Sequence, residues 1–449
     1  MIVLTTTKIK PLGGSPVMAI IPQMSLFSWT DVEELGDLDR LRLVIEYLPD
    51  NKLMKTLEKE RRNGRDDYPI RAVWNTILAG VVFEHKSTES LRRELKRNAQ
   101  LRWLCGLEGV VVPPAYVYSR FMKKLFVHEK EVEFMFSTLV SEIVELLPNF
   151  GASLAIDGKA IQSFATGKNK NEKEDGRRDT DADYGRKAYK GKREDGTMWE
   201  KIVKWFGYKL HLIVDSVYEL PVAYSVTKAS VPDINAAHDL LDEIEKDRPS
   251  LLQRAEEMSG DRGYDDTKLH VRLWDDHGIK PVIDIRNMWK DGEETRLLGD
   301  YKNVVHDFKG SVYCYCPVSN KLREMANGGF EKDRNTLKKL CPARQYGIDC
   351  EGAHKCPVAQ GIRIPLEEDR RIFTPIDRSS YKWKKAYNKR TAVERVNSRL
   401  DVSFGFENHT IRGMKKMKIK CGLSLCIMLA MALGRIKEKQ PEKMRSLVS

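Results

Sequence analysis

The chain has 449 residues, 41% of them hydrophobic and 32% charged, which describes a soluble globular protein of two or three domains with a heavily charged surface. Its formal net charge is +12, and residues 381–420 alone hold twelve Lys and Arg against three acidic residues. Such a positive field favours a polyanion, nucleic acid before an anionic membrane. The most apolar stretch, residues 421–434, is shorter than the ~20 residues that span a bilayer, so a membrane protein is not expected.

The N-terminal half of the chain begins with a lead-in, residues 1–27, which lacks the charged-then-apolar order of a signal peptide. We therefore expect a cytoplasmic protein with reduced cysteines. Residues 28–148 show helical periodicity, including a helix that starts at the N-cap candidate Ser87 and stops at Gly106, with another after Pro114. The basic face of the first helix carries Arg92, Arg93, Lys96 and Arg97. This N-terminal helical domain either binds DNA through that face or simply exposes it to solvent.

Strands replace helices from residue 149. Alternating or continuous apolar runs predict three strands, a helix capped by Asp233, a fourth strand, a further helix and a fifth strand. We therefore expect an α/β (α+β) fold with a mixed five-stranded sheet flanked by helices. Residues 166–196 lie between the first two strands and hold almost no apolar side chains, which predicts a mobile surface loop.

Residues 287–380 interrupt this pattern and are interpreted as an insertion. A strong helix over residues 381–400 and an apolar helix, expected to pack on the sheet, then follow. Residues 149–286 and 381–436 are thus predicted to form one core domain, followed by a tail, residues 437–449. The insertion contains five of the eight cysteines: Cys314, Cys316, Cys341, Cys350 and Cys356. Their irregular spacing leaves two interpretations open, a structural zinc site or buried thiols in a reducing cell.

Three carboxylates have a common chemical interpretation. Asp157 is predicted to end the first strand, Asp261 to end the fourth, and Glu394 to lie in the middle of the helix over residues 381–400. The first and fourth strands can be neighbours, and three anions at close range need cations among them. Oxygen ligands suit two Mg²⁺ or Mn²⁺ ions that promote phosphodiester cleavage. Taken singly, the aspartates are also typical of turns or helix caps, and Glu394 of an ion pair with Arg390.

The segments "AIDGKAI", "SGDRGYD" and "YNKRTAVERVNSRLD", in this order, resemble the DDE-type transposases of bacterial insertion sequences, which have an RNase H-like catalytic fold. In one branch of that family a helix carries Tyr, Arg, Glu and Lys at fixed intervals. Tyr387, Arg390 and Glu394 match the first three positions, whereas Asp401 stands at the lysine position. The resemblance extends over residues 65–165, 199–285 and 381–434, and it implies that Asp157, Asp261 and Glu394 are the catalytic metal ligands. Side chains expected to contact the DNA are Tyr387, Arg390, Lys159, Arg395 and Arg399.

These patterns together predict a DNA transposase of a bacterial insertion sequence. It would bind the terminal inverted repeats of its element, cut a strand at each end and join the ends to target DNA. The expected partners are double-stranded transposon ends, target DNA and a second copy of the chain in a homodimer on DNA, in the cytoplasm at the nucleoid. Two alternatives stay open: an RNase H-like metal-dependent nuclease that does not join strands, and a catalytically inactive, transposase-derived DNA-binding protein.

Overall fold

A computed structural model describes residues 35–61, 67–107, 111–165, 167, 179–193 and 195–447. The chain forms two compact units, which are described separately. The first comprises Met1–Leu146, Gln162–Ala182 and Arg399–Ser449, and the second Leu147–Ile161 and Asp183–Ser398. The predicted lead-in over residues 1–27 lies outside the described residues.

The first unit is helical. Its elements are α2 (Leu38–Tyr47), α3 (Asn51–Arg61), α4 (Ile70–Val82), α5 (Thr88–Arg97), α6 (Ala99–Leu104), α7 (Ala115–Leu125), α8 (Glu129–Leu146), α15 (Met414–Lys437) and the 3₁₀ turn η6 (Pro441–Lys443). The single helix predicted between Ser87 and Gly106 is wrong, because the segment forms two helices. Ser87 caps α5 by accepting from the Ser90 N–H, and Asn98 ends α5 and caps α6 by accepting from the Leu101 N–H at 2.9 Å. Asparagine side chains compete with the helix backbone in this way.

The apolar helix α15 forms the core of the first unit. It packs against α8, α2 and α4, and not on the sheet as the sequence predicts. Gly434 permits the close approach to α2, because a Cβ there would lie 2.7 Å from the side chains of Leu43 and Tyr47. By length and composition α15 would qualify to cross a membrane, but 83% of its most apolar window is buried inside the protein.

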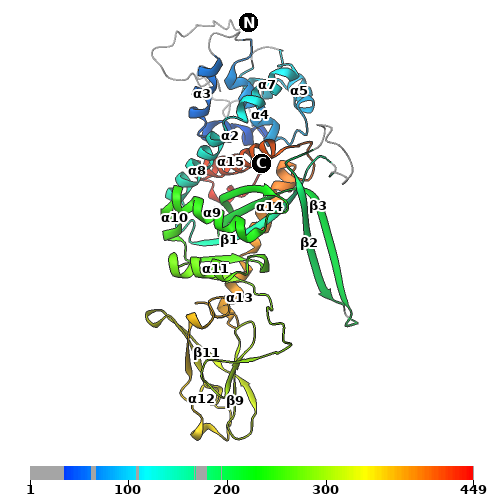
Figure 1. Cartoon of the computed structure of the whole chain (residues 1–449). Coiled ribbons are helices and arrows are strands. Elements are labelled where there is room, and N and C mark those ends of the chain that lie inside the picture. The colour runs from blue at the N-terminus through cyan, green and yellow to red at the C-terminus, as the bar shows by residue number, and fades with distance from the viewer. Residues whose placement is uncertain are drawn as a thin grey trace. The chain divides into compact units, whose positions relative to one another are not determined.

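The second unit is built on a mixed sheet (Figure 1). Its strands are β1 (Ser153–Gln162), β2 (Asp183–Lys192), β3 (Met198–Asp215), β4 (Leu220–Lys228), β5 (Glu257–Gly260) and β6 (Lys280–Ile283). The order is β2-β3-β1-β5-β6, with β4 also paired to β3. Strands β1, β5 and β6 are parallel, whereas β3 is antiparallel to β2 and β4. The connections carry α9 (Asp233–Asp247), α10 (Pro249–Arg254), η1 (Arg262–Tyr264), α11 (Thr267–Val271) and the π-helical η2 (Arg272–Asp276). The predicted mixed sheet flanked by helices is confirmed, with six strands in place of five.

Two strand boundaries differ from the sequence predictions. Strand β1 does not end at Asp157 but continues to Gln162. The predicted surface loop over residues 166–196 is also wrong in its second half, because Asp183–Lys192 forms β2 and pairs with β3 from Gly207 to Met198. The β2 sequence, "DYGRKAYKGK", has no apolar alternation from which a strand could be recognised.

The insertion is a β-rich subdomain with a core of its own. Its elements are β7 (Arg296–Leu297), β8 (Val304–His306), β9 (Val312–Tyr315), β10 (Leu322–Glu324), β11 (Ala326–Glu331), η3 (Lys332–Arg334), β12 (Thr336–Leu340), α12 (Pro342–Tyr346), η4 (Ala353–Lys355), β13 (Ile362–Pro365) and η5 (Leu366–Glu368). The strands form a four-stranded sheet, β10-β9-β8-β7, and a three-stranded sheet, β11-β12-β13. Buried side chains such as Val304, Leu337 and Phe373 fill the space between them.

Candidate catalytic site

Asp157 and Asp261 come together through the parallel pairing of β1 with β5. Ile156 is the register partner of Gly260, so the next residue on each strand is an aspartate. Asp157 lies in the middle of β1, and Asp261 directly follows β5 as the N-cap of η1. The Asp261 carboxylate accepts from the Gly263 N–H at 2.7 Å, which fixes the turn. The sequence prediction that these two aspartates are neighbours thus agrees with the strand register.

The environment of Asp157 disfavours an isolated negative charge. Burial raises the pKa of Asp157 to about 6, the ammonium of Lys187 opposes this rise, and the Asp261 carboxylate adds to it. Lys187 comes from β2 and donates to the Gly158 carbonyl at 3.3 Å. A desolvated carboxylate beside a second carboxylate has the donor chemistry that suits a divalent cation.

Glu394 is held differently from the sequence prediction. The helix predicted over residues 381–400 is two helices, α13 (Tyr381–Asn388) and α14 (Thr391–Phe404), so Glu394 lies in the first turn of α14 and not in mid-helix. Arg390 lies in the break between them, and its Nη1 is 2.7 Å from Glu394 Oε1. The Arg390 guanidinium also lies 5.6 Å from the ring centroid of Tyr387, which stacks on Trp383. Tyr387, Arg390 and Glu394 therefore contact one another in series.

The junction of α13 and α14 is fastened to the sheet. Lys389 donates to Glu257 of β5 at 2.6 Å and approaches the Ser153 hydroxyl of β1 at 3.4 Å. The Arg390 charge also lowers the pKa of Asp157, after the larger effects of burial, Lys187, Asp261 and the Gly158 N–H. Arg390 thus pairs directly with Glu394 and also stabilises the negative charge of Asp157.

The carboxylates fit a metal ion only in part. Asp157 and Asp261 are adjacent, but nowhere in the described ranges do three His, Cys, Asp or Glu side chains converge closely enough to hold one ion. The Glu394 carboxylate is paired with Arg390 in the structure, and its place as the third metal ligand stays a prediction.

Asp233 is a further acidic residue of this site that the sequence analysis missed. Its predicted role as a helix cap is wrong, because Pro232 is the N-cap of α9 and Asp233 accepts from Lys209 at 2.9 Å. A Cβ at Gly158 would lie 2.9 Å from Asp233 Oδ1 and 3.3 Å from His211 Nδ1. His211 is fully buried, and its Nδ1 has no hydrogen-bond partner in the part of the chain that the structure describes. The only sequence signal was a glycine inside a strand, which often marks a close approach.

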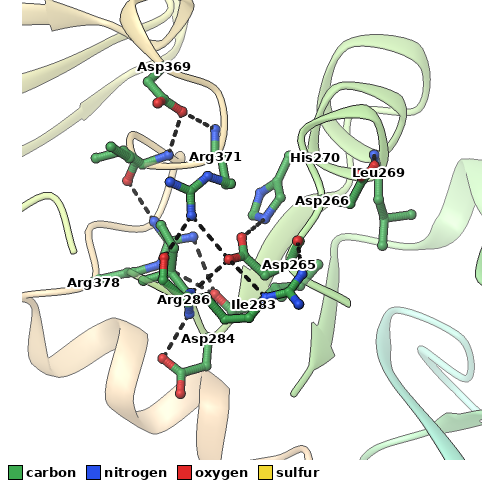
Figure 2. A network of polar contacts seen from close by, with 12 residues as sticks. Asp265, Asp266, Leu269, His270, Ile283, Asp284, Arg286, Asp369, Arg371 and Arg378 are labelled. Atoms are coloured by element: carbon green, nitrogen blue, oxygen red, sulfur yellow. Dashed lines mark hydrogen bonds and ion pairs between the residues drawn. The ribbon is translucent and has the colours of Figure 1, made fainter. Parts of the chain in front are cut away.

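An ionic network surrounds the buried Asp265, which ends the short helix η1 that follows Asp261 (Figure 2). Asp265 accepts from the Arg286 N–H at 2.7 Å and from Arg371 Nη1 at 3.1 Å. Arg371 also donates to the Arg286 carbonyl at 3.0 Å, and Arg378 donates to the carbonyls of Ile283 and Ile372. The two ends of the insertion are therefore bound to each other and to the Asp261 turn.

The predicted DNA contacts have varied environments. Arg395 is half-exposed and pairs with Glu219 at 2.8 Å, and Lys159 lies two residues beyond Asp157 on β1. On α5, Arg93, Lys96 and Arg97 are exposed, whereas Arg92 is half-buried and bound to Glu89 and the Pro113 carbonyl. Arg399 and Asp401 are half-buried in the first unit. Their roles stay predictions.

The insertion cysteines are free thiols in the structure. Cys316 accepts from the Ser319 N–H at 3.5 Å, and hydrogen bonds from Ser319 hold the pKa of the Cys316 thiol at about 6. The thiol of Cys350 hydrogen-bonds to Cys316, while burial raises the Cys350 pKa. No three potential ligands converge within the described ranges, and the structural zinc site stays a prediction.

Comparisons with known proteins place these features in a family. A family model described as the transposase DDE domain matches residues 153–430, and one described as a transposase domain (DUF772) matches residues 31–124. No curated protein matches the chain. Among solved structures, a cryo-EM structure of a piggyBac transposase synaptic complex with hairpin DNA is 12% identical in sequence, covers 94% of this chain and 81% of its own, and superposes with a TM-score of 0.37.

Proposed function

Because the chain belongs to the transposase DDE domain family, and is therefore a polynucleotidyl transferase, we propose that it cuts and joins DNA at the ends of its own insertion sequence. The observation that carries this proposal is the strand register that sets Asp157 beside Asp261. Glu394, the third carboxylate of the proposed set, belongs to the same unit, where it is paired with Arg390.

The residues divide into metal ligands and phosphate contacts. Asp157 and Asp261 would hold the divalent ions of this family, and Glu394 would join them once its carboxylate leaves Arg390. When bound, Mg²⁺ or Mn²⁺ neutralises charge on the phosphodiester and activates the attacking oxygen. Arg390, freed from Glu394, can bind a phosphate through two parallel N–H groups, and the Tyr387 hydroxyl can orient a backbone oxygen.

Two successive displacements describe the proposed reaction. Water attacks a phosphodiester at each transposon end, which breaks one P–O bond and leaves a 3′-hydroxyl. That hydroxyl attacks a phosphodiester of the target, so one bond forms as another breaks. Double-stranded ends and target DNA are the substrates, and pairing of two ends requires at least a homodimer on DNA.

The test is cleavage of a labelled duplex that carries the terminal repeat of the element, with Mg²⁺, Mn²⁺ or EDTA. Wild type should nick at the repeat boundary only with metal, and Asp157→Asn, Asp261→Asn and Glu394→Gln should each lower the rate by about 100-fold or more. Asp239→Asn, an exposed carboxylate on α9, is the matched control and should cleave normally.

Products joined to a second duplex separate the proposed transposase from a nuclease, which would yield nicks alone. Binding without cleavage under every metal condition would contradict the proposal and identify an inactive DNA-binding relative.

A further inference from the structure

The strands β2 and β3 extend beyond the rest of their sheet as a two-stranded ribbon (Figure 1). The first seven residues of β3, Met198–Lys204, are exposed, whereas the strand is buried from Trp205 onward apart from the half-buried Phe206. At about 3.3 Å per residue, the exposed part is roughly 23 Å long. A two-stranded ribbon is at best marginally stable in water, so this one needs support from its own side chains or from a partner.

Two tryptophans brace the ribbon from within. Trp205 lies against Gly185 and Trp199 against Gly191, each on the residue directly opposite across the strands. A Cβ at Gly191 would come within 2.5 Å of the Trp199 indole, so the glycine is required for this contact. Aromatic rings that cover cross-strand glycines stabilise a ribbon locally.

Apolar side chains nevertheless stay at the surface of the ribbon. Ile202 is 44% exposed, Val203 38% and Met198 71%. Ile202 and Val203 are adjacent and so point to opposite faces. Met198 and Ile202 lie on the same face of the ribbon, so that face exposes apolar surface that a partner can cover.

The charges of the ribbon identify the class of partner. Residues 183–207 hold seven Lys and Arg against four acidic residues, a net charge of +3. Arg186 and Lys204 are both exposed and are directly opposite each other across the strands. Like charges in this position destabilise a ribbon, and an anion bound between them removes the repulsion.

The base of the ribbon adjoins the candidate catalytic site. Lys187, the cross-strand partner of Val203, reaches the Gly158 carbonyl, one residue from Asp157. DNA held at Asp157 would therefore meet the ribbon as it leaves the site. An antiparallel two-stranded ribbon also has the dimensions to enter the major groove of DNA.

We propose that the β2–β3 ribbon is a DNA-binding arm that grips the phosphate backbone of the duplex beside the catalytic carboxylates. This inference rests on the proposed function and adds a contact surface to it. Phosphates bind between Arg186 and Lys204, while Ile202 and Met198, which lie on the same face of the ribbon, pack against the sugars and the groove wall. Since the contacts are to the backbone, the arm holds terminal-repeat and unrelated duplexes alike.

The test compares Arg186→Ser/Lys204→Ser with Lys246→Ser/Lys355→Ser, a control that removes two exposed cations elsewhere in the same unit. Affinity of the full chain for duplex DNA is measured against salt concentration, for terminal-repeat and unrelated sequences. Loss of two phosphate contacts should lower the slope of log affinity against log salt by about two in the arm variant, with the control unchanged. Unaltered thermal unfolding of the arm variant confirms that it folds.

An unchanged salt slope in the arm variant, while wild type cleaves the terminal repeat, would overturn the arm and leave the proposed function standing. Failure of wild type to cleave would instead count against the proposed function. A second experiment measures the oligomeric state of wild type and of Trp199→Ala by light scattering in the absence of DNA. If wild type is a dimer and this variant a monomer, the ribbon is an interface between copies and the DNA-binding proposal is overturned.

Discussion

Arg390 Nη1 lies 2.7 Å from Glu394 Oε1, so the third candidate carboxylate is bound to an arginine one helical turn away. The guanidinium is held in place by Tyr387, and the burial that disfavours its charge is offset by the Glu394 partner. In the proposed function, metal and arginine would compete for the same carboxylate. Assembly of the proposed metal site would then require an exchange of partners, in which Glu394 turns to the aspartates and Arg390 turns to the DNA.

Replacement of Arg390 by Gln should make Mg²⁺ bind more readily. A partly exposed ion pair contributes about 0.3–1 kcal/mol, so its removal should lower the Mg²⁺ concentration for half-maximal thermal stabilisation by about two- to fivefold. Cleavage at saturating Mg²⁺ should nevertheless fall, because Arg390 no longer binds phosphate. Arg395→Gln is the neighbouring control. An unchanged Mg²⁺ midpoint in Arg390→Gln would show that Glu394 does not join the metal site.

A methyl group at Gly158 should disturb the site through Asp233. The new Cβ would meet Asp233 Oδ1 at 2.9 Å, so either the carboxylate or the strand that carries Asp157 must move. Gly158→Ala should slow cleavage by roughly tenfold or more. The double variant Gly158→Ala/Asp233→Ala should be little slower than Asp233→Ala alone, because the shortest contact is gone and only the approach to His211 Nδ1 at 3.3 Å remains. Additive losses in this cycle would show that Asp233 does not mediate the effect.

Asp265→Asn should destabilise the protein far more than its neighbour Asp266→Asn. Asp265 is buried and faces Arg371 and Arg286, and removal of one partner from such a network costs about 3–5 kcal/mol. Asp266 caps α11 by accepting from the Leu269 N–H and lies 3.9 Å from His238 Nε2, and Asn caps a helix about as well as Asp, so Asp266→Asn should cost well under about 1 kcal/mol. The loss of stability in each variant is measured by thermal unfolding and by the protease sensitivity of the insertion. Equal effects of the two substitutions would contradict the anchoring role of Asp265.

His270 should make the protein less stable in mild acid. Burial lowers the pKa of His270 well below its usual 6.5, and the charges of Arg378 and Arg371 lower it further, although Asp265 lies 4.0 Å away. The unfolded chain then binds a proton that the folded chain refuses, so stability present above about pH 6.5 is lost as the pH falls. Between about pH 7 and pH 5, the free energy of unfolding of His270→Leu should fall by about 2 kcal/mol less than that of wild type. The exposed His354→Leu is the control, and parallel pH profiles for His270→Leu and wild type would refute the prediction.

The sequence predicted the sheet well where burial leaves a pattern. The apolar run before Asp157 and the alternation from Trp205 onward each identify a buried strand, and the turn at Asp261 identifies the end of β5, although β1 continues past Asp157 to Gln162. Prediction from the sequence failed where side chains face water, and where residues far apart in the chain come into contact. Strand β2 has few buried side chains to impose alternation, and the break before Glu394 lies inside a strongly helical pattern. The approach of Asp233 to Gly158 depends on how β1, β3 and α9 pack, which no local periodicity records.

The hydrogen bond from Arg371 to the Arg286 carbonyl bears on which changes of sequence and length the insertion can tolerate. Since Arg371 donates to the Arg286 carbonyl at 3.0 Å, the segment between them begins and ends at one point. Because its ends lie together, such a segment can become longer or shorter while β6 and α13 keep their positions. Its core, with Val304, Leu337 and Phe373, also takes in Ile285 and contacts Trp274. Changes in the insertion that keep these contacts, and the Trp274–Asn335 and Asp275–Arg370 pairs, should therefore leave the catalytic sheet in place.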